Sequence, residues 1–332
     1  MPDGRPEDRA RTPFRSPAWL PGGHAQTIYP VFLRRPVVAY RRERITTRDG
    51  DFWDFDWLVD RPGTPPDAPL VALFHGLEGS AQSQYALLLM VLLSAHGWRG
   101  VVPHFRGCGG TPNLRPRAYH SGDHEEVGAM LAELRARVDP RTPLYAAGIS
   151  LGGSALLNWI GRAGRDAQRT LAAAAAVSVP LDLMASGIAI GQGLNRIYTW
   201  HFLQTLKPKG LDIARRFPGT LDAERIARVR TMWDFDDAVT APLHGFTGAE
   251  DYWTRASSKP WLADLVLPTL VLNARNDPFV PGSSLPDATQ VSRAVLLEQP
   301  ETGGHAGFLT GPAPGRLEWL PQRLFTFFQS GR

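Results

Sequence analysis

One serine stands in a setting typical of a nucleophile. Ser150 is the centre of the pattern Gly-x-Ser-x-Gly at 148–152, between an apolar run at 144–147 and a helical pattern that begins near Ser154. A sharp turn from a strand into a helix needs small residues two positions either side of the serine, because the backbone there is tight and strained. The N-terminus of the helix offers backbone N–H groups to a developing oxyanion. The pattern therefore predicts that Ser150 attacks an acyl group.

Such a serine needs a base and an orienting acid, which follow it in the chain in the order serine, acid, histidine. His305 lies on a glycine-rich loop after the last expected strand, and such a loop is better suited to projecting a side chain into a cleft than to core packing. Asp277 follows the strand expected at 269–273 and is the acid we expect to orient His305. Asp182 follows an earlier strand and remains a second candidate, whereas Asp264 lies at the far end of the 269–273 strand.

Two backbone amides are candidates for holding the oxyanion. The sequence His75-Gly76-Leu77 follows an apolar run at 70–74, at the carboxyl end of a core strand, where ligand sites of open α/β sheets lie. We expect the Leu77 amide to join the Leu151 amide there as an oxyanion hole. His75 is expected to hold the loop rather than to perform chemistry.

Other site chemistries find less support. The glycines at 152–153 are not followed by the lysine of a phosphate-binding loop, and the run at 107–110 lacks dinucleotide-binding spacing. No HExxH, CxxC or paired-carboxylate signature is present, so we expect neither a metal nor another cofactor. The single cysteine, Cys108, excludes a disulfide framework and is expected to be a buried or partly buried small apolar side chain.

The elements that must position these residues alternate between strands and helices. At 51–58 the aromatic residues Trp53, Phe55 and Trp57 alternate with aspartates. An alternation with a period of two predicts a half-buried antiparallel strand. Further strands are expected at 70–74, 100–105, 144–147, 172–179, 269–273 and 294–297, and helices at 85–95, 127–138, 154–161 and 317–328. The alternation predicts an α/β fold with a mostly parallel central sheet flanked by helices.

Between residues 181 and 258 the alternation stops, and helical segments rich in tryptophan replace it. We interpret this stretch as a helical cap inserted into an α/β core made of residues 42–180 and 259–332. Residues 1–41 are expected to pack on that core as an N-terminal segment. The aromatic side chains of the cap could line an acyl pocket or form the core of the cap itself.

Charge and hydropathy limit the classes of partner that the chain could bind. The chain of 332 residues has a net charge of +4, and only three of its 36 cations are lysines. An arginine-rich chain could bind nucleic acid, but most of the arginines are scattered among acids, which favours a solvated surface and no nucleic-acid partner. No apolar run reaches 18 residues and the N-terminus lacks the apolar stretch of a secretory signal, so we expect a cytoplasmic protein without a transmembrane segment. Peripheral membrane contact and the oligomeric state stay open.

Longer motifs resemble one family. They are PAWLPGGHAQTI at 17–28, HFRGC at 104–108 with YHSGD at 119–123, and FDD at 235–237 with APLHGF at 241–246. Together they resemble the bacterial YheT-like hydrolases of the α/β-hydrolase superfamily, from about Phe14 to the C-terminal helix. The resemblance implies an esterase- or lipase-like serine hydrolase, with Ser150, Asp277 and His305 at the charge-relay positions. Eukaryotic relatives include acylglycerol and phospholipid hydrolases. For the 17–28 segment we expect a structural role over the core.

These observations predict a serine carboxylic-ester hydrolase that forms an acyl-enzyme on a small-molecule ester. Short-to-medium-chain acyl esters or acylglycerols are the expected substrates. The same residues could instead pass the acyl group to an alcohol, which is the alternative prediction of an acyltransferase.

Overall fold

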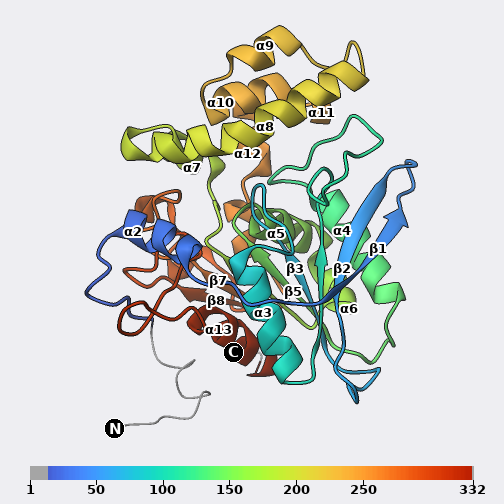
Figure 1. The fold of residues 1–332 in the computed structure, drawn as a ribbon, viewed down its shortest axis with the longest axis vertical. Coiled ribbons are helices and arrows are strands. Elements are labelled where there is room, and N and C mark those ends of the chain that lie inside the picture. The colour runs from blue at the N-terminus through green and yellow to red at the C-terminus, as the bar shows by residue number, and fades with distance from the viewer. Residues whose placement is uncertain (1–13, 331–332) are drawn as a thin grey trace.

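A single eight-stranded sheet is the centre of the computed structural model, which describes residues 14–330 and therefore only part of the expected N-terminal segment at 1–41 (Figure 1). The strand order is β1-β2-β4-β3-β5-β6-β7-β8. The strands are β1 (Tyr40–Thr46), β2 (Phe52–Leu58), β3 (Leu70–Phe74), β4 (Arg99–Pro103), β5 (Leu144–Ile149), β6 (Ala173–Val177), β7 (Thr269–Leu272) and β8 (Val295–Glu298). β2 runs antiparallel to β1 and to β4, and every other pair is parallel.

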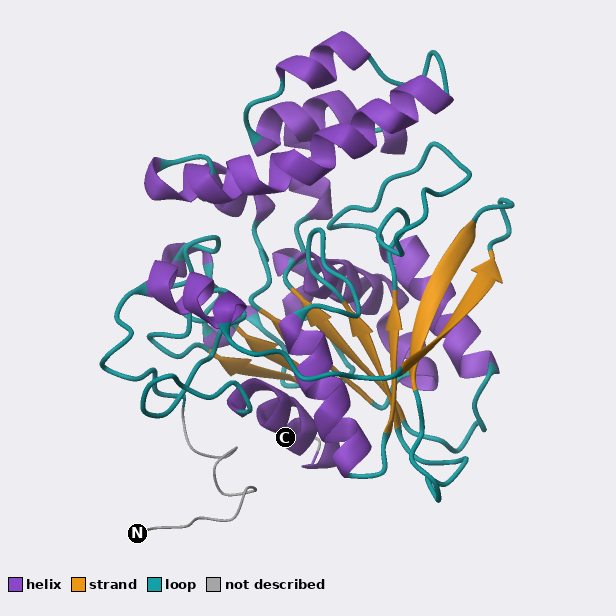
Figure 2. Ribbon diagram, in the orientation of Figure 1, coloured by secondary structure: helices purple, strands orange, loops and turns teal. Residues whose placement is uncertain are grey.

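Helices cover both faces of the sheet (Figure 2). They are α3 (Gln84–Ala95), α4 (His124–Ala136), α5 (Leu151–Ala163), α6 (Ala167–Thr170) and α13 (Trp319–Ser330). α4 and α5 share one apolar core with the sheet, and α3 and α13 share the other. β3 and β6 are continuous apolar runs with every residue buried, as strands covered on both faces must be. The predicted fold class is therefore confirmed.

Six α-helices lie between β6 and β7, and we call them the cap helices. They are α7 (Leu183–Ile190), α8 (Arg196–Arg216), α9 (Ala223–Arg228), α10 (Met232–Phe235), α11 (Ala241–His244) and α12 (Ala249–Ala256). Buried Leu203, Ile226 and Val239 belong to a core of their own. The arrowheads of the central strands point toward the cap helices, so the loops that follow these strands lie between the sheet and the cap (Figure 2). None of the helices within residues 14–330 has the length and apolar character needed to cross a membrane.

The expectation of a half-buried strand at 51–58 was wrong, because all seven residues of β2 are buried. We did not predict β1 from the sequence, and its Arg42 and Arg44 lie directly opposite Asp56 and Asp54 of β2. Arg42 donates to Asp56 through two nitrogens at 2.7 and 2.8 Å, and Arg44 donates to Asp54 at 2.8 and 2.9 Å. These arginines cover the face that the aspartates were expected to expose to water.

Asp56 is also the hydrogen-bond partner of a buried histidine, since its Oδ2 lies 2.8 Å from Nε2 of His104. Burial opposes ionisation of Asp56, but the hydrogen bonds from Arg42 and His104 outweigh it and hold its pKa well below the ordinary value.

Substitution Asp56→Ala is expected to lower the free energy of unfolding by about 2–4 kcal/mol, because it leaves His104 buried without its acceptor. The control is Asp60→Ala, whose carboxylate is half exposed and 4.0 Å from Arg99. It should change stability by less than about 0.5 kcal/mol. Urea denaturation of both variants measures the difference, and equal effects would contradict the structural role of Asp56.

Candidate active site

Ser150 occupies the turn between β5 and α5 with φ 53° and ψ −122°, a conformation that residues other than glycine rarely adopt. Its amide donates to the carbonyl of Val177 on β6 at 2.8 Å. The flanking glycines are required by close approach. A Cβ on Gly152 would lie 2.4 Å from the carbonyl oxygen of His75, and one on Gly148 would lie 2.5 Å from the Cα of Gly153.

His305 and Asp277 come together after two different strands. Nδ1 of His305 lies 2.8 Å from Oδ2 of Asp277, and the aspartate side chain is fully buried. The other carboxylate oxygen accepts the amide of Phe279 at 2.8 Å, and the Phe279 ring packs 4.3 Å from the imidazole. Asp182, the alternative acid, instead caps α7 by accepting the amide of Ala185 at 3.0 Å. The geometry therefore pairs His305 with Asp277.

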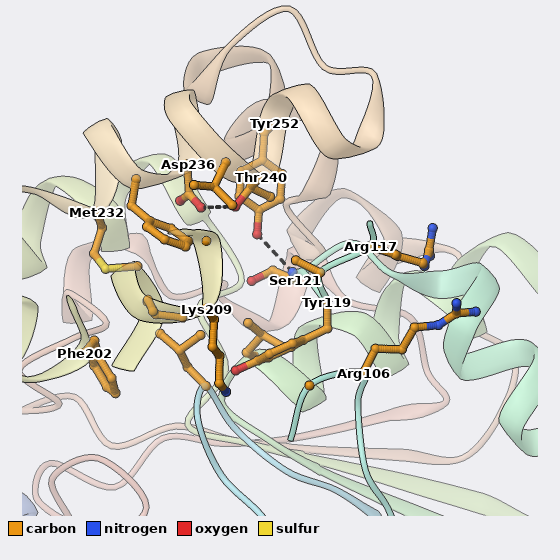
Figure 3. Close-up of a pocket in the computed structure, with 18 of the residues that line it drawn as sticks. Arg106, Arg117, Tyr119, Ser121, Phe202, Lys209, Met232, Asp236, Thr240 and Tyr252 are labelled. Carbon is orange, nitrogen blue, oxygen red and sulfur yellow. Dashed lines mark hydrogen bonds between the residues drawn. The ribbon is translucent and has the colours of Figure 1, made fainter. Parts of the chain in front are cut away.

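Ser150 and His305 both line two cavities. The larger, about 500 Å³, lies between the core and the cap helices, and the second, about 460 Å³, lies beside α2 (Gly23–Ile28) and α3. Leu77 and Phe202 also line both cavities. Apolar side chains form much of the cap wall of the larger cavity: Leu183, Ile190, Leu206, Met232, Phe235 and Val239. Figure 3 shows this cavity with Met232 and Tyr252 above it and Tyr119 below.

The loop after β3 carries the predicted Leu77 amide. His75 is fully buried, its Nδ1 lies 2.9 Å from the carbonyl of Gly76, and its Nε2 accepts the amide of Phe105 at 3.3 Å. Burial lowers the pKa of His75 to about 3, so the ring is neutral and holds the loop. Within residues 14–330, neither the Leu77 nor the Leu151 amide donates to a protein group, and both residues line the larger cavity.

A cap residue is tied to this loop. Nζ of Lys209, on α8, lies 2.6 Å from Oε1 of Glu78, the residue after Leu77. Glu78 has φ 55°, and it exchanges hydrogen bonds with the Tyr119 hydroxyl at 2.7 and 2.9 Å. Cys108 lies nearby with Sγ 3.9 Å from Lys209, and burial raises its thiol pKa to about 12. The thiol is therefore neutral, which disfavours it as a nucleophile.

The loop that carries His305 is held by residues that sequence reasoning did not assign to the site. Four successive amides, at 303–306, each donate to a side chain from another segment. The acceptors are Gln26 at 2.9 Å, Asn276 at 3.1 Å, Thr27 at 2.9 Å and Ser178 at 2.9 Å, in that order. The 17–28 motif therefore does more than cover the core. The signal in the sequence that could have identified this role was the polar pair Gln26-Thr27, which lies within a long motif whose chemistry was unexplained.

The comparisons with known proteins agree with this architecture. A family model described as the α/β hydrolase fold matches residues 69–312. YheT of Escherichia coli, named as a candidate esterase, is 36% identical over 304 residues, which are 91% of this chain and 88% of that protein. The human phospholipase ABHD3 is 30% identical over 319 residues, covering 94% of this chain and 77% of that protein.

Solved structures show the same fold at low identity. Est1E from Butyrivibrio proteoclasticus, solved with ferulic acid, superimposes with a TM-score of 0.54 at 16% identity, covering 89% of this chain and 100% of that chain. The esterase EaEST from Exiguobacterium antarcticum gives a TM-score of 0.54 at 14% identity, covering 87% and 100%. The chain belongs to the esterase- and lipase-type α/β-hydrolase family. Within that family it is a YheT-like protein, as its motifs predicted.

Asp236 lines the larger cavity as a buried carboxyl, and within residues 14–330 it makes no salt bridge. It accepts hydrogen bonds from Oγ1 of Thr240 at 2.6 Å and from Nε1 of Trp253 at 2.7 Å (Figure 3 shows the first). Burial raises its pKa to about 6, although these two hydrogen bonds favour the charged form.

This pKa predicts a pH-dependent stability. A carboxyl whose pKa is about 4 when unfolded and about 6 when folded stabilises the fold below pH 4. That contribution, about 3 kcal/mol, is lost as the pH rises through 6. Asp236→Asn removes the titration, so the melting temperature of the variant relative to the unsubstituted protein should rise between pH 4.5 and 7.5. Thermal melts across this range test it, and a difference independent of pH would contradict the assignment.

Proposed function

We propose that this protein is a serine carboxylic-ester hydrolase whose catalytic residues are Ser150, Asp277 and His305. The observation that carries the proposal is a convergence. Ser150 with its strained backbone and His305 with its partner Asp277 are brought together, and both Ser150 and His305 line the larger cavity. Leu77 and Leu151 line it too, and their amides donate to no protein group within residues 14–330. The names of its relatives, which describe a candidate esterase, a phospholipase and a monoacylglycerol lipase, support the same class of reaction.

In this mechanism His305 takes the proton of Ser150 as the serine oxygen attacks the ester carbonyl. The amides of Leu77 and Leu151 donate to the oxyanion of the tetrahedral intermediate. His305 then gives its proton to the departing alcohol and leaves an acyl-enzyme. A water molecule activated by His305 releases the acid and restores Ser150. Asp277 orients the imidazole and stabilises its charged form.

The larger cavity supports an apolar acyl group as the part of the substrate that is recognised. Its cap wall is formed by aliphatic and aromatic side chains, and about 500 Å³ is within the usual range for a small-molecule site. We therefore propose short-to-medium-chain acyl esters or acylglycerols as substrates, with the acyl chain under the cap helices and the alcohol toward the second cavity.

Ser150→Ala should lower kcat on p-nitrophenyl esters from acetate to decanoate by at least about 10³-fold, because the nucleophile is lost. Ser186→Ala is the matched control, since Ser186 lines the same cavity from α7 and should retain activity within about twofold. Equal activity of Ser150→Ala and the unsubstituted protein would refute the proposal. Product analysis with added ethanol distinguishes hydrolysis from acyl transfer to an alcohol.

Gln26→Leu tests whether the N-terminal segment positions the histidine. Gln26 is 2% exposed, and its Oε1 accepts from Gly303 at 2.9 Å and from Asn276 at 3.0 Å. Without this oxygen His305 should be misplaced, so kcat should fall by about tenfold or more with little change in KM. Gln168→Leu, an exposed control on α6 that lines neither cavity, should leave both constants unchanged. A rise in KM with kcat unaltered would contradict a positioning role.

A further inference from the structure

Exposed apolar side chains concentrate on two segments. Among the residues that the structure describes, nine of the fourteen large apolar side chains that are exposed belong to residues 19–37 or 188–200. Six of them form what we call the apolar rim: Val31, Phe32, Ile188, Leu194, Ile197 and Trp200. Their exposed fractions reach 80% for Phe32 and 63% for Trp200, and a concentration of this kind on a soluble surface marks an interaction site.

The two segments lie side by side. Nδ1 of His24, on α2, is 3.0 Å from the hydroxyl of Tyr198, on α8, and the two rings stack. Figure 1 shows α2 and the beginning of α8 on the same flank of the molecule. The second cavity lies between them, since Val31 and His201 line it together with Ser150 and His305. Because Val31 and His201 are themselves exposed, this cavity opens to solvent beside the apolar rim.

The formal charge within the two segments has one sign. Residues 14–42 and 183–211 contain no Asp or Glu, although the whole chain has 32. Arg34, Arg35 and Arg196 are exposed within the same two segments. Glu78, which lines the second cavity, is neutralised by its ion pair with Lys209. The rim is therefore an apolar surface bordered by cations.

We infer that the apolar rim binds the surface of an anionic phospholipid bilayer. Aliphatic and aromatic side chains enter the boundary of headgroups and acyl chains, while the arginines contact anionic headgroups. A second copy of this chain fits less well, because a two-fold symmetric interface would place the same arginines against each other without acids to pair them. The second cavity then faces the lipid. Delivery of an ester to Ser150 through the opening of this cavity rests on the proposed function. Binding of the rim to the bilayer does not.

The test is co-sedimentation of the full chain with vesicles of phosphatidylcholine alone or mixed with phosphatidylglycerol. Binding to the mixed vesicles should be stronger and should weaken as salt is raised. Phe32→Ser with Trp200→Ser should lower the partition coefficient by tenfold or more, because neither side chain then enters the lipid. Arg34→Gln with Arg196→Gln should lower it by about fivefold per arginine on mixed vesicles only. The control Val59→Ser, at an exposed site outside both segments, should bind normally.

The outcomes separate this inference from the proposed function. Ser150→Ala should bind vesicles like the unsubstituted protein, so a failed esterase assay leaves the binding measurement intact. Hydrolysis of soluble p-nitrophenyl acetate should be unchanged in Phe32→Ser with Trp200→Ser, which also verifies that the variant is folded. If neither the unsubstituted protein nor Phe32→Ser with Trp200→Ser hydrolyses the ester, this assay cannot verify folding. The vesicle binding of Arg34→Gln with Arg196→Gln then decides whether the rim binds anionic lipid. Absence of binding to mixed vesicles, or equal binding by the variants and the control, overturns the inference. So does sedimentation as a dimer that the rim substitutions abolish.

Discussion

Four successive amides in the loop that carries His305 need hydrogen-bond acceptors, and the glycine-rich loop supplies none of its own. Side chains from α2, from the loop after β6 and from the loop after β7 supply them. A buried amide without an acceptor lowers the stability of the fold by about 1–3 kcal/mol. These hydrogen bonds therefore hold three segments of the chain against the loop that carries His305. Thr27 acts from 278 positions away in the sequence. The pairing of His305 with Asp277 depends on this arrangement.

The cap helices complete the site from the other side. They contribute an apolar wall to the larger cavity, and Lys209 ties α8 to Glu78 beside the Leu77 amide. A displacement of α8 would therefore disturb both the acyl pocket and the loop that carries a proposed oxyanion donor. The second cavity, which Ser150 also lines, opens beside α2. The same N-terminal helix thus supports the His305 loop and borders a route to it.

Local patterns in the sequence were sufficient for the fold class and for the candidates Ser150, Asp277 and His305, because strands, turns and loop ends leave short-range signals. Contacts between distant segments leave none. β1 was missed because only one of its seven residues is buried, so it has no apolar period, and its arginines then made β2 buried on both faces. Gln26 and Ser178 were missed for the same reason, since a polar side chain that accepts an amide far along the chain resembles any solvated one.

The most direct test of the account is the site at which an organophosphate reacts. Paraoxon should transfer its diethylphosphoryl group to the Ser150 oxygen and release p-nitrophenolate, because the residues that activate the serine toward an ester also activate it toward this reagent. Peptide mass spectrometry should find one adduct, on Ser150, formed together with loss of esterase activity. An adduct on another residue that accompanies this loss, or full activity after Ser150 is modified, would contradict the account.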